Sequence, residues 1–196
     1  MEWISGNYYL SEEEMQNNAK LVYSIMSHTH GWTLEAIAGM LGNMESESTI
    51  NPGIWESLTI SPEMGFGLVQ WTPSTNYTAW ANNLGADITA GDLQLWWIAT
   101  ETENYGQWIE TEEFPVTFDD FTVSTLPPEY LALVFLRNFE RAGIEVAQER
   151  QEQARKWYDY LSESGSDIEP PVEPPIEPII PKKKKMPVWM MCRRWY

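Results

Sequence analysis

Apolar residues recur at intervals of three and four along several stretches of the chain, a spacing that places them on one face of a helix. The first stretch begins after Ser11, which can cap a helix and pair with the Glu three positions later, and the helix should end near His28. The second stretch has Thr33 as its cap and carries an apolar stripe that buries one face. We expect this second helix to present Glu45 and Glu47 at its C-terminal end.

Three more helices are predicted further along the chain. One covers Asp92 to about Glu103, one begins at Pro127, where proline suits a first turn, and one covers residues 147–161 with the charged side chains of 149–153 outward. Between the second and third helices, residues 51–67 contain Asn-Pro-Gly and Ser-Pro, which are turn sequences and indicate a loop or a small β element. The pattern therefore predicts a mainly α domain with a small loop or β region.

The composition changes abruptly after residue 161. Residues 162–181 are rich in proline and glutamate, which favour neither helix nor sheet and should form a stiff, extended linker. Residues 182–196 form a basic, aromatic tail with four consecutive lysines. We therefore expect one folded domain over residues 1–161, a linker, and a tail. The tail either binds an acidic partner or an anionic membrane surface, or is a disordered solubilising end.

The chain is strongly acidic, and the excess negative charge lies in the predicted domain. It has 12 basic and 29 acidic residues, for a formal net charge of −17, and residues 1–166 carry six basic and 25 acidic side chains. Such a surface repels phosphate backbones, which excludes nucleic acid as a partner of the domain. A neutral glycan fits better, because some of the eleven Trp rings can stack on sugars, although most should be core.

Several further classes of protein are disfavoured by what the sequence contains. Cys192 is the single cysteine, so no intramolecular disulfide is expected. No secretory signal is recognisable at the N-terminus, and no apolar run is long enough to span a membrane. His28 and His30 have no organised carboxylate or thiol partners, so we expect neither a metal nor another cofactor. The protein is then expected to reach an extracellular glycan inside a particle or through a hole made by a partner.

Residues 42–73 combine a carboxylate at a helix end with a glycine-rich turn that carries Gln70. Cleavage of a glycosidic bond requires a protonated acid beside the leaving oxygen, and burial against apolar side chains keeps a Glu protonated. Glu47 follows Met44, and Phe66 and other apolar residues are close in sequence. We expect these neighbours to enclose the Glu47 carboxyl, which makes it the candidate acid.

The same residues resemble a known family. Glu47-Ser48, Asn51-Pro52 and the Gly-Phe-Gly-Leu-Val-Gln run ending at Gln70 are similar to the Glu-Ser, Asn-Pro and Gly-Leu-Met-Gln signature of goose-type lysozymes and soluble lytic transglycosylases. The closer resemblance is to phage tail-associated lysozymes, in which Gly-Met-Leu-Gly-Asn-Met, Ser-Glu-Ser-Thr-Ile-Asn-Pro-Gly and Gly-Leu-Val-Gln-Trp-Thr-Pro recur. It covers about residues 8–161. It implies a lysozyme-like α+β fold in which the loop region walls a glycan cleft.

The resemblance also implies roles for single residues. The catalytic acid falls on Glu47, the Glu directly before Ser-Thr-Ile-Asn-Pro, whereas Glu45 is expected to be a solvated helix-end carboxylate. Ser48 and Gln70 match positions that line the sugar cleft. Trp71 lies beside turn-like polar sequence and is expected to contribute a ring to substrate binding.

A second carboxylate is harder to assign. Goose-type enzymes have an Asp two residues after the Gln, where this chain has Thr72. An inverting hydrolase places a base roughly 6.5–9.5 Å from the acid, and Glu56 and Glu63 are the candidates nearby, each equally well explained as a surface charge. Alternatively, the acetamido group of the substrate assists and the acid acts alone. The pair Glu140-Arg141 is expected to form a structural ion pair or a cap contact.

The function implied is that of a phage virion-associated peptidoglycan hydrolase, a muramidase. It would cleave the β-1,4 bond between N-acetylmuramic acid (MurNAc) and N-acetylglucosamine (GlcNAc), aiding cell-wall penetration and genome ejection. One alternative is a lytic transglycosylase that gives 1,6-anhydro products, and another is a non-enzymatic module for wall binding or tail assembly. We expect the protein in the phage tail of the virion or in the host cytoplasm during infection. Expected partners are peptidoglycan and, through the C-terminal tail, other phage tail proteins.

Overall fold

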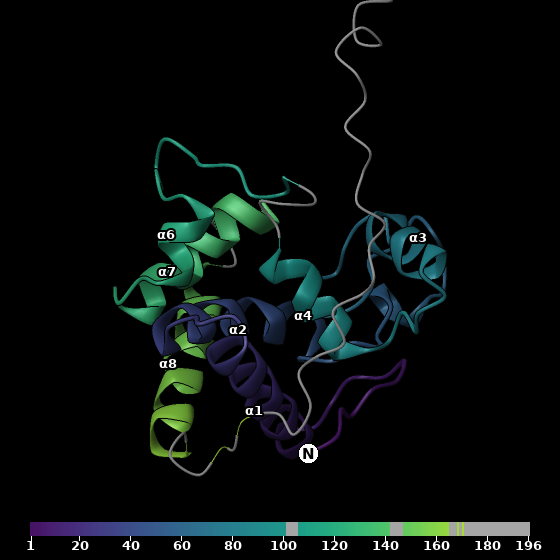
Figure 1. Ribbon diagram of the computed structural model, residues 1–196, viewed down its shortest axis with the longest axis horizontal. Helices are drawn as coiled ribbons and strands as arrows, with labels where there is room; N and C mark the ends of the chain where they lie inside the picture. Colours follow the sequence, from purple (N-terminus) through teal and green to yellow (C-terminus); the bar gives the residue numbers. More distant parts are fainter. Residues whose placement is uncertain (101–105, 142–146, 165–167, 169, 171–196) are drawn as a thin grey trace, which may run out of the picture.

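The structure, a computed structural model, describes residues 1–100, 106–141, 147–164, 168 and 170. Within these residues the chain is mainly helical (Figure 1). The helices are α1 (Glu12–His28), α2 (Leu34–Ser48), α3 (Thr75–Asn83), α4 (Gly91–Ala99), α6 (Phe118–Thr122), α7 (Pro128–Phe135) and α8 (Ala147–Ser164), with a short 3-10 helix η1 (Glu56–Leu58) and a π-helical turn η2 (Leu136–Glu140). The predicted linker and tail lie almost wholly outside the described residues, so the division of the chain at residue 161 stays a prediction.

Helix α2 is the central element of what we call the helical body, formed by α1, α2, α6, α7 and α8 (Figure 1). Two glycines let its neighbours approach closely. A Cβ atom at Gly39 would lie 2.9 Å from the backbone of Leu131 in α7, and one at Gly42 would lie 2.4 Å from the carbonyl oxygen of Arg150 in α8. Because these two positions have no side chain, the backbones of α7 and α8 lie directly against α2.

The predicted starts of the first two helices are confirmed. Ser11 and Glu14 form the expected capping box, in which the Ser11 hydroxyl accepts from the Glu14 amide and the Glu14 carboxylate accepts from the Ser11 amide. Thr33 caps α2 by accepting from the amide of Ala36. Helix α2 ends where Thr49 adopts a left-handed conformation, at φ 53°. The chain therefore turns sharply at Thr49, two residues after the candidate acid Glu47.

The three later helices are confirmed with changed bounds. Helix α4 begins one residue earlier than predicted and ends at Ala99, and residues 101–105 lie outside the described part. Helix α7 begins at Pro128, and its last turn widens into the π-helical η2, which the pattern did not predict. Helix α8 spans Ala147–Ser164, three residues longer than expected.

Helices α3 and α6 were not predicted. Helix α3 has the sequence Thr-Asn-Tyr-Thr-Ala-Trp-Ala-Asn-Asn, in which Tyr77, Thr78 and Ala81 are the buried residues, so it has almost no apolar stripe. Helix α6 has five residues and is too short to show a period, although Thr117 caps it by accepting from the amide of Asp120. Both helices are held by aromatic packing rather than by amphipathic sequence.

Residues 49–85, which we call the loop lobe, lie on the far side of α4 from the helical body (Figure 1). The β part of the expected α+β fold is reduced there to two isolated bridges, Trp55 with Phe66 and Phe66 with Trp71, and no strand is found among the described residues. Buried side-chain amides bond to backbone groups that strand pairing would satisfy in a sheet. Asn51, Gln94 and Asn18 are fully buried and bond to backbone groups of the lobe and of the N-terminal segment.

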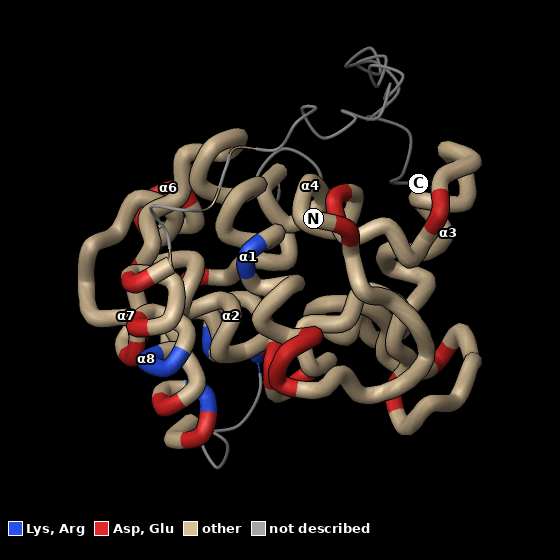
Figure 2. Tube along the Cα trace, turned by 90° about the horizontal axis from the view of Figure 1, so that it is seen from below, with Lys and Arg blue, Asp and Glu red and all other residues tan. Residues whose placement is uncertain are grey.

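Acidic positions are spread around the molecule, whereas basic positions are few and gather mainly on and near α8 (Figure 2). Most of the tryptophans among the described residues pack into the core or against it, as expected. Among the described helices, none has the length and apolar character needed to cross a lipid bilayer.

Candidate active site

Glu47 lies in the last turn of α2, where the helical body meets the loop lobe. Its side chain is 22% exposed and forms part of the wall of two neighbouring open cavities. The larger cavity has a volume of about 570 Å³ and the smaller one about 230 Å³. Gln70 and Thr72 also line both, so the two cavities meet around these three side chains. Together they form a cleft of the size that holds small ligands.

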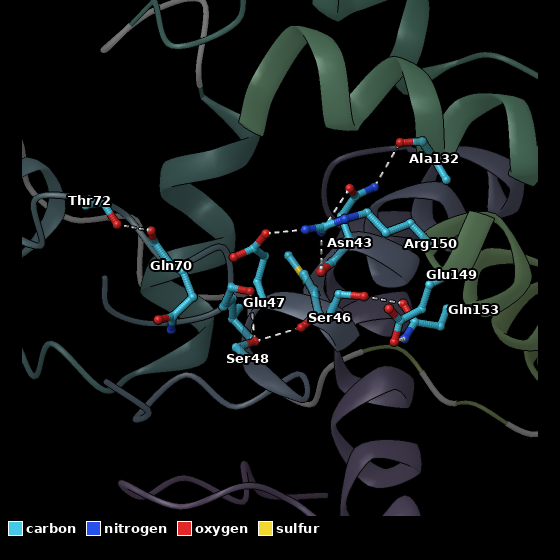
Figure 3. A network of polar contacts seen from close by, with 12 residues as sticks. Asn43, Ser46, Glu47, Ser48, Gln70, Thr72, Ala132, Glu149, Arg150 and Gln153 are labelled. Carbon is cyan, nitrogen blue, oxygen red and sulfur yellow. Dashed lines mark hydrogen bonds and ion pairs between the residues drawn. The ribbon is translucent and has the colours of Figure 1, made fainter. Parts of the chain in front are cut away.

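The Glu47 carboxylate is held by Arg150 from α8. The Arg150 Nη2 atom lies 2.5 Å from Glu47 Oε1, and its Nη1 donates to both the backbone and side-chain oxygens of Asn43 (Figure 3). The Asn43 amide in turn donates to the carbonyl oxygens of Gly39 and Ala132. Helices α2, α7 and α8 are thus joined by one polar chain that ends at the candidate acid. This chain fixes the orientation of the Glu47 carboxylate.

Two expectations from the sequence are wrong, one for Arg150 and one for Glu47. Residues 149–153 were expected to face outward, but Arg150 is 5% exposed and points into the protein. Glu47 was expected to sit among apolar side chains, but its carboxylate contacts the Arg150 guanidinium at a partly exposed position. The apolar residues behind it, Met44 and Phe66, belong to the core. The physical reason is that an inward Arg satisfies the carboxylate more effectively than apolar burial would.

Gln70 stands on the opposite wall of the cleft (Figure 3). It has a left-handed backbone at φ 47°, and its side-chain amide donates to the carbonyl oxygen of Gly67 at 2.9 Å. Position 67 requires glycine, because its φ is 80° and a Cβ atom there would have no space beside Gln94. The glycine-rich turn thus fixes Gln70 at the cleft, in agreement with its predicted location, although its binding role stays a prediction.

Ser48 and Trp71 are both buried, and their substrate-binding role stays a prediction. Ser48 is 1% exposed, and its hydroxyl lies 2.8 Å from the carbonyl oxygen of Leu68, so it ties α2 to the loop lobe. Trp71 borders the larger cavity but is 2% exposed, with its ring stacked on Tyr77 at 4.6 Å between centroids. Ser48 therefore supports the wall of the cleft from behind, whereas Trp71 forms part of the wall with little of its surface exposed. Sequence reasoning identified the right segment but could not tell which side chains face solvent.

Glu140 is a candidate functional residue that sequence reasoning missed. It ends the π-helical turn η2 and lines the larger cavity together with Glu47. Its Oε1 atom is buried and has no hydrogen-bond partner among the described residues. Burial raises the pKa of Glu140 well above its usual value of 4.5, and the neighbouring Glu47 carboxylate raises it further, against the opposing effect of Arg150 and Arg141. The cavity therefore contains a carboxyl group whose neutral form is favoured by its burial.

Of the two contacts expected for Glu140 and Arg141, the ion pair is not formed, whereas Arg141 does occupy the C-cap position of η2. The Arg141 guanidinium instead donates to the carbonyl oxygen of Gln107 at 3.2 Å, and Arg141 has a left-handed backbone at φ 59°. No ion pair joins the two side chains in the described part of the protein. Arg141 is exposed at the rim of the larger cavity, where it provides positive charge in an otherwise acidic protein.

The candidates for a second carboxylate lie in different surroundings. Glu56 lines the smaller cavity and accepts a hydrogen bond from the Gly65 amide at 2.9 Å. Glu63 is exposed, borders neither of these two cavities, and accepts a hydrogen bond from the Ser61 hydroxyl, which lowers its pKa. Thr72 occupies the position where goose-type enzymes carry an Asp, at the junction of the cavities. Glu56 and Glu140 are therefore the carboxyls that share a cavity with Glu47.

Glu45, two residues before Glu47, has a different environment from the one expected. Its side chain is 14% exposed rather than solvated, and it accepts hydrogen bonds from Lys156 Nζ and Trp157 Nε1, both at 2.7 Å. These bonds attach α2 to α8 away from the cleft. Among the described residues, no group of three or more side chains able to hold a metal ion is present.

A helical domain with a cleft between a helix-end glutamate and a glycine-rich loop defines a lysozyme-like protein. The model of the phage tail lysozyme family matches residues 17–161, and the chain belongs to this family. Morphogenesis protein 1 of Bacillus phage B103 is 45% identical to it over 165 residues, which cover 84% of this chain and 44% of that protein. The chain thus spans less than half the length of this relative.

Proposed function

We propose that this protein is a virion-associated muramidase that cleaves the β-1,4 bond between MurNAc and GlcNAc in peptidoglycan, with Glu47 as the general acid. The observation that carries the proposal is the position of Glu47 at the junction of two open cavities. A polymer lying across this junction would place sugars on both sides of one carboxyl group. That is the arrangement needed to cut inside a chain rather than at its end.

The reaction follows from the placement of this group. Glu47 gives a proton to the bridging oxygen, the bond from that oxygen to the anomeric carbon breaks, and the leaving sugar departs with a hydroxyl group. Water then adds hydroxide to the anomeric carbon, and its remaining proton restores the carboxyl group. Gln70, on the opposite wall, is placed to hydrogen-bond the sugar at the reacting position.

Two neighbouring groups, Arg150 and Glu140, set the surroundings of the Glu47 carboxyl group. Arg150 orients its carboxylate through the 2.5 Å contact, and Glu140 holds a proton in the same cavity because burial raises its pKa. Because burial favours the neutral form of Glu140, a proton is present in the cavity that Glu47 also lines. Glu140 can donate a proton but is a poor base, so it does not fill the position of a water-activating carboxylate. The remaining candidates for assisting the reaction are the acetamido group of the substrate and Glu56 in the smaller cavity.

Hydrolysis and transglycosylation differ in what attacks the anomeric carbon. If water attacks, the products carry reducing ends, and if the 6-hydroxyl of the same sugar attacks, they carry 1,6-anhydro ends. We favour hydrolysis because both cavities are open and the walls of the cleft carry polar side chains. Mass spectrometry of digested peptidoglycan measures this directly, and 1,6-anhydro ends as the main product would contradict the hydrolase.

The proposed setting is the phage tail, where a wall-cutting domain would open peptidoglycan during genome ejection. It is supported by the family to which the chain belongs and by the phage relative. A location in the host cytoplasm late in infection is the alternative. Proteomics of purified particles separates the two, because a virion protein is present in them at a fixed copy number.

The test is a pair of single substitutions two residues apart. Glu47→Gln keeps the size of the side chain and removes the acid, so wall-clearing activity should fall about 10²- to 10⁴-fold while the protein stays folded. Glu45→Gln is the matched control, since Glu45 binds Lys156 and Trp157 outside the cleft, and it should lower stability but not activity per folded molecule. Wild-type clearing by Glu47→Gln would refute the assignment.

The name of the phage relative, a morphogenesis protein, favours a second candidate function, a lysozyme-like module for wall binding or tail assembly. That module would bind peptidoglycan without releasing product. Particles carrying Glu47→Gln would then assemble and infect normally, whereas removal of residues 167–196 would block assembly. Normal infection of walled cells by Glu47→Gln particles would favour this module over the muramidase.

A further inference from the structure

The smaller cavity beside Glu47 is walled on its outer side by the N-terminal segment of the chain. Tyr9, Trp55 and Glu56 line it, next to the shared residues Glu47 and Gln70. The family match begins at residue 17, so Tyr9 lies outside the part of the chain that the family model describes. This side of the cleft is therefore completed by residues that precede the matched part of the chain.

The N-terminal segment is fixed firmly against the loop lobe. The Asn51 side-chain amide donates to the carbonyl oxygens of Gly6 and Tyr8, at 2.7 and 2.6 Å, and its oxygen accepts from the Gly6 amide. Gly53 leaves room for this contact, since a Cβ there would lie 2.7 Å from the Gly6 nitrogen. These bonds hold the backbone directly before Tyr9 in place.

Further bonds extend the contact on both sides. The Trp55 amide donates to the Asn7 side chain at 3.0 Å, and the Leu10 amide donates to the Thr49 hydroxyl at 2.9 Å. The segment is bonded on both sides of Tyr9, at Tyr8 and at Leu10, so the ring is presented by an ordered support. A preorganised wall binds a ligand without first losing conformational freedom.

The side chains on this wall suit an uncharged sugar ring. Tyr9 is 61% exposed, which is unusual for a large ring at a fixed position, and Trp55 is half-buried with its ring 4.7 Å from that of Phe66. Flat rings offer apolar faces on which a sugar can stack, and the carboxylate of Glu56 accepts hydrogen bonds from hydroxyl groups. The same carboxylate repels anionic substituents. The positive group at the cleft, Arg141, lies on the wall of the other cavity.

We propose that Tyr9 and Trp55 form a sugar subsite that takes an uncharged N-acetylglucosamine ring on one side of Glu47. The larger cavity, with Arg141 at its wall, then takes the muramic acid ring, whose lactyl group or peptide carries negative charge. This inference rests on the proposed function and deepens it, because it sets the direction in which the glycan crosses the cleft. It also gives the N-terminal segment a role in substrate binding.

The experiment measures binding separately from catalysis. Peptide-free glycan strands of alternating GlcNAc and MurNAc are titrated into the full chain carrying Glu47→Gln, with calorimetry as the readout. Adding Tyr9→Ala should weaken binding about three- to tenfold, the range of one aromatic contact. Tyr9→Phe keeps the ring and should bind like the parent. Tyr8→Ala is the matched control, since Tyr8 is 44% exposed but does not line the cavity.

Each outcome either supports the sugar subsite or contradicts it. Weaker binding in Tyr9→Ala alone supports the subsite, whereas unchanged affinity in Tyr9→Ala, or an equal loss in Tyr8→Ala or Tyr9→Phe, would overturn it. Failure of the proposed function is seen elsewhere, as wall clearing by Glu47→Gln in an otherwise unchanged protein. In the active protein, Tyr9→Ala should raise KM for the same strands with little change in kcat.

Discussion

The helical body and the loop lobe form the two walls of one cleft but are stabilised in different ways. In the helical body, α2 packs on α7 and α8 through a large apolar cluster, and close contacts at Gly39 and Gly42 bring the backbones together. In the loop lobe, backbone groups that no sheet satisfies bond to buried side-chain amides, such as Asn51 within the lobe and Gln94 from α4. The apolar cluster extends into the loop lobe as well, but the lobe depends in addition on a few buried amides that satisfy its backbone groups.

This difference matters for the cleft because each wall supplies one side of it. Glu47 and Arg150 come from the helical body, whereas Gln70 and Thr72 come from the loop lobe. A single substitution in the loop lobe should therefore release a whole wall, while one in the helical body should shift a helix. Changes of each kind test whether the contrast holds.

The largest effect is expected from Asn51→Ala. Asn51 is fully buried, and its side chain bonds to Gly6, Tyr8 and Gly53. Its removal leaves several buried backbone groups without partners, so the free energy of unfolding should fall by about 2–4 kcal/mol. Urea unfolding followed by tryptophan fluorescence measures it, and the N-terminal segment should become sensitive to proteases.

The control for this substitution is Asn7→Ala. Asn7 also bonds across the same contact, accepting from the Trp55 amide and donating to the carbonyl oxygen of Leu58, but it is exposed. Water can replace its bonds, so the cost should stay below about 1 kcal/mol. Equal costs for Asn51→Ala and Asn7→Ala would show that the loop lobe does not depend on its buried amides.

A smaller effect is expected from Gly42→Ala in the helical body. The new Cβ would meet the backbone of Arg150 at 2.4 Å and that of Ala154 at 2.8 Å, so α8 must move away from α2. We expect a loss of about 1–3 kcal/mol, typical of overpacking, together with reduced wall clearing because Arg150 is displaced from Glu47. Thermal unfolding and a clearing assay measure the two quantities.

Gly39→Ala is the matched substitution one turn earlier. Its Cβ would meet the backbone of Leu131 at 2.9 Å, so it displaces α7 and leaves α8 in contact with Glu47. Stability should fall as in Gly42→Ala, but activity per folded molecule should be better preserved. If both variants lose activity to the same extent, the position of α8 is not what holds the acid in place.

The contrast between the two walls also explains how much could be predicted from the sequence. Helices α1, α2, α7 and α8 were predicted because their apolar faces repeat with the period of the helix. The loop lobe has no such period, so its turns were predicted from the Asn-Pro-Gly sequence, but the bonds from Asn51 to the N-terminal segment were not. Contacts between side-chain amides and distant backbone leave no local pattern.

The candidate site shows the same limit at the level of single residues. Glu47 was found through the motif around it, whereas Arg150 is 103 residues away in sequence and was assigned to the surface. A signal for Arg150 was present, since it lies on the same helical face as Ala154, Trp157 and Leu161, all of which are buried. Glu140 had no such signal, because the π-helical turn changes the direction of its side chain relative to a regular helix.

Glu140 lies where the two walls meet at the larger cavity, and the effect of Glu140→Gln should appear as a dependence on pH, smallest at the acid end. The unfolded chain ionises Glu140 near its usual pKa of 4.5, whereas burial keeps it protonated to higher pH in the folded protein. The free energy of unfolding of the wild type therefore falls as the pH rises from that value through the raised pKa, by at most about 1.4 kcal/mol per pH unit from this group. Gln does not titrate, so Glu140→Gln should gain stability relative to the wild type over the same range.

The comparison of Glu140→Gln with the wild type is made by urea unfolding at several values between about pH 4 and pH 8. The difference in unfolding free energy should be near zero or slightly negative at the acid end and should rise toward the neutral end. Glu149→Gln, on the exposed side of α8, controls for the loss of one negative charge. A difference for Glu140→Gln that stays flat with pH would mean that the cavity does not hold this proton, and Glu47 would then have to work without a protonated neighbour.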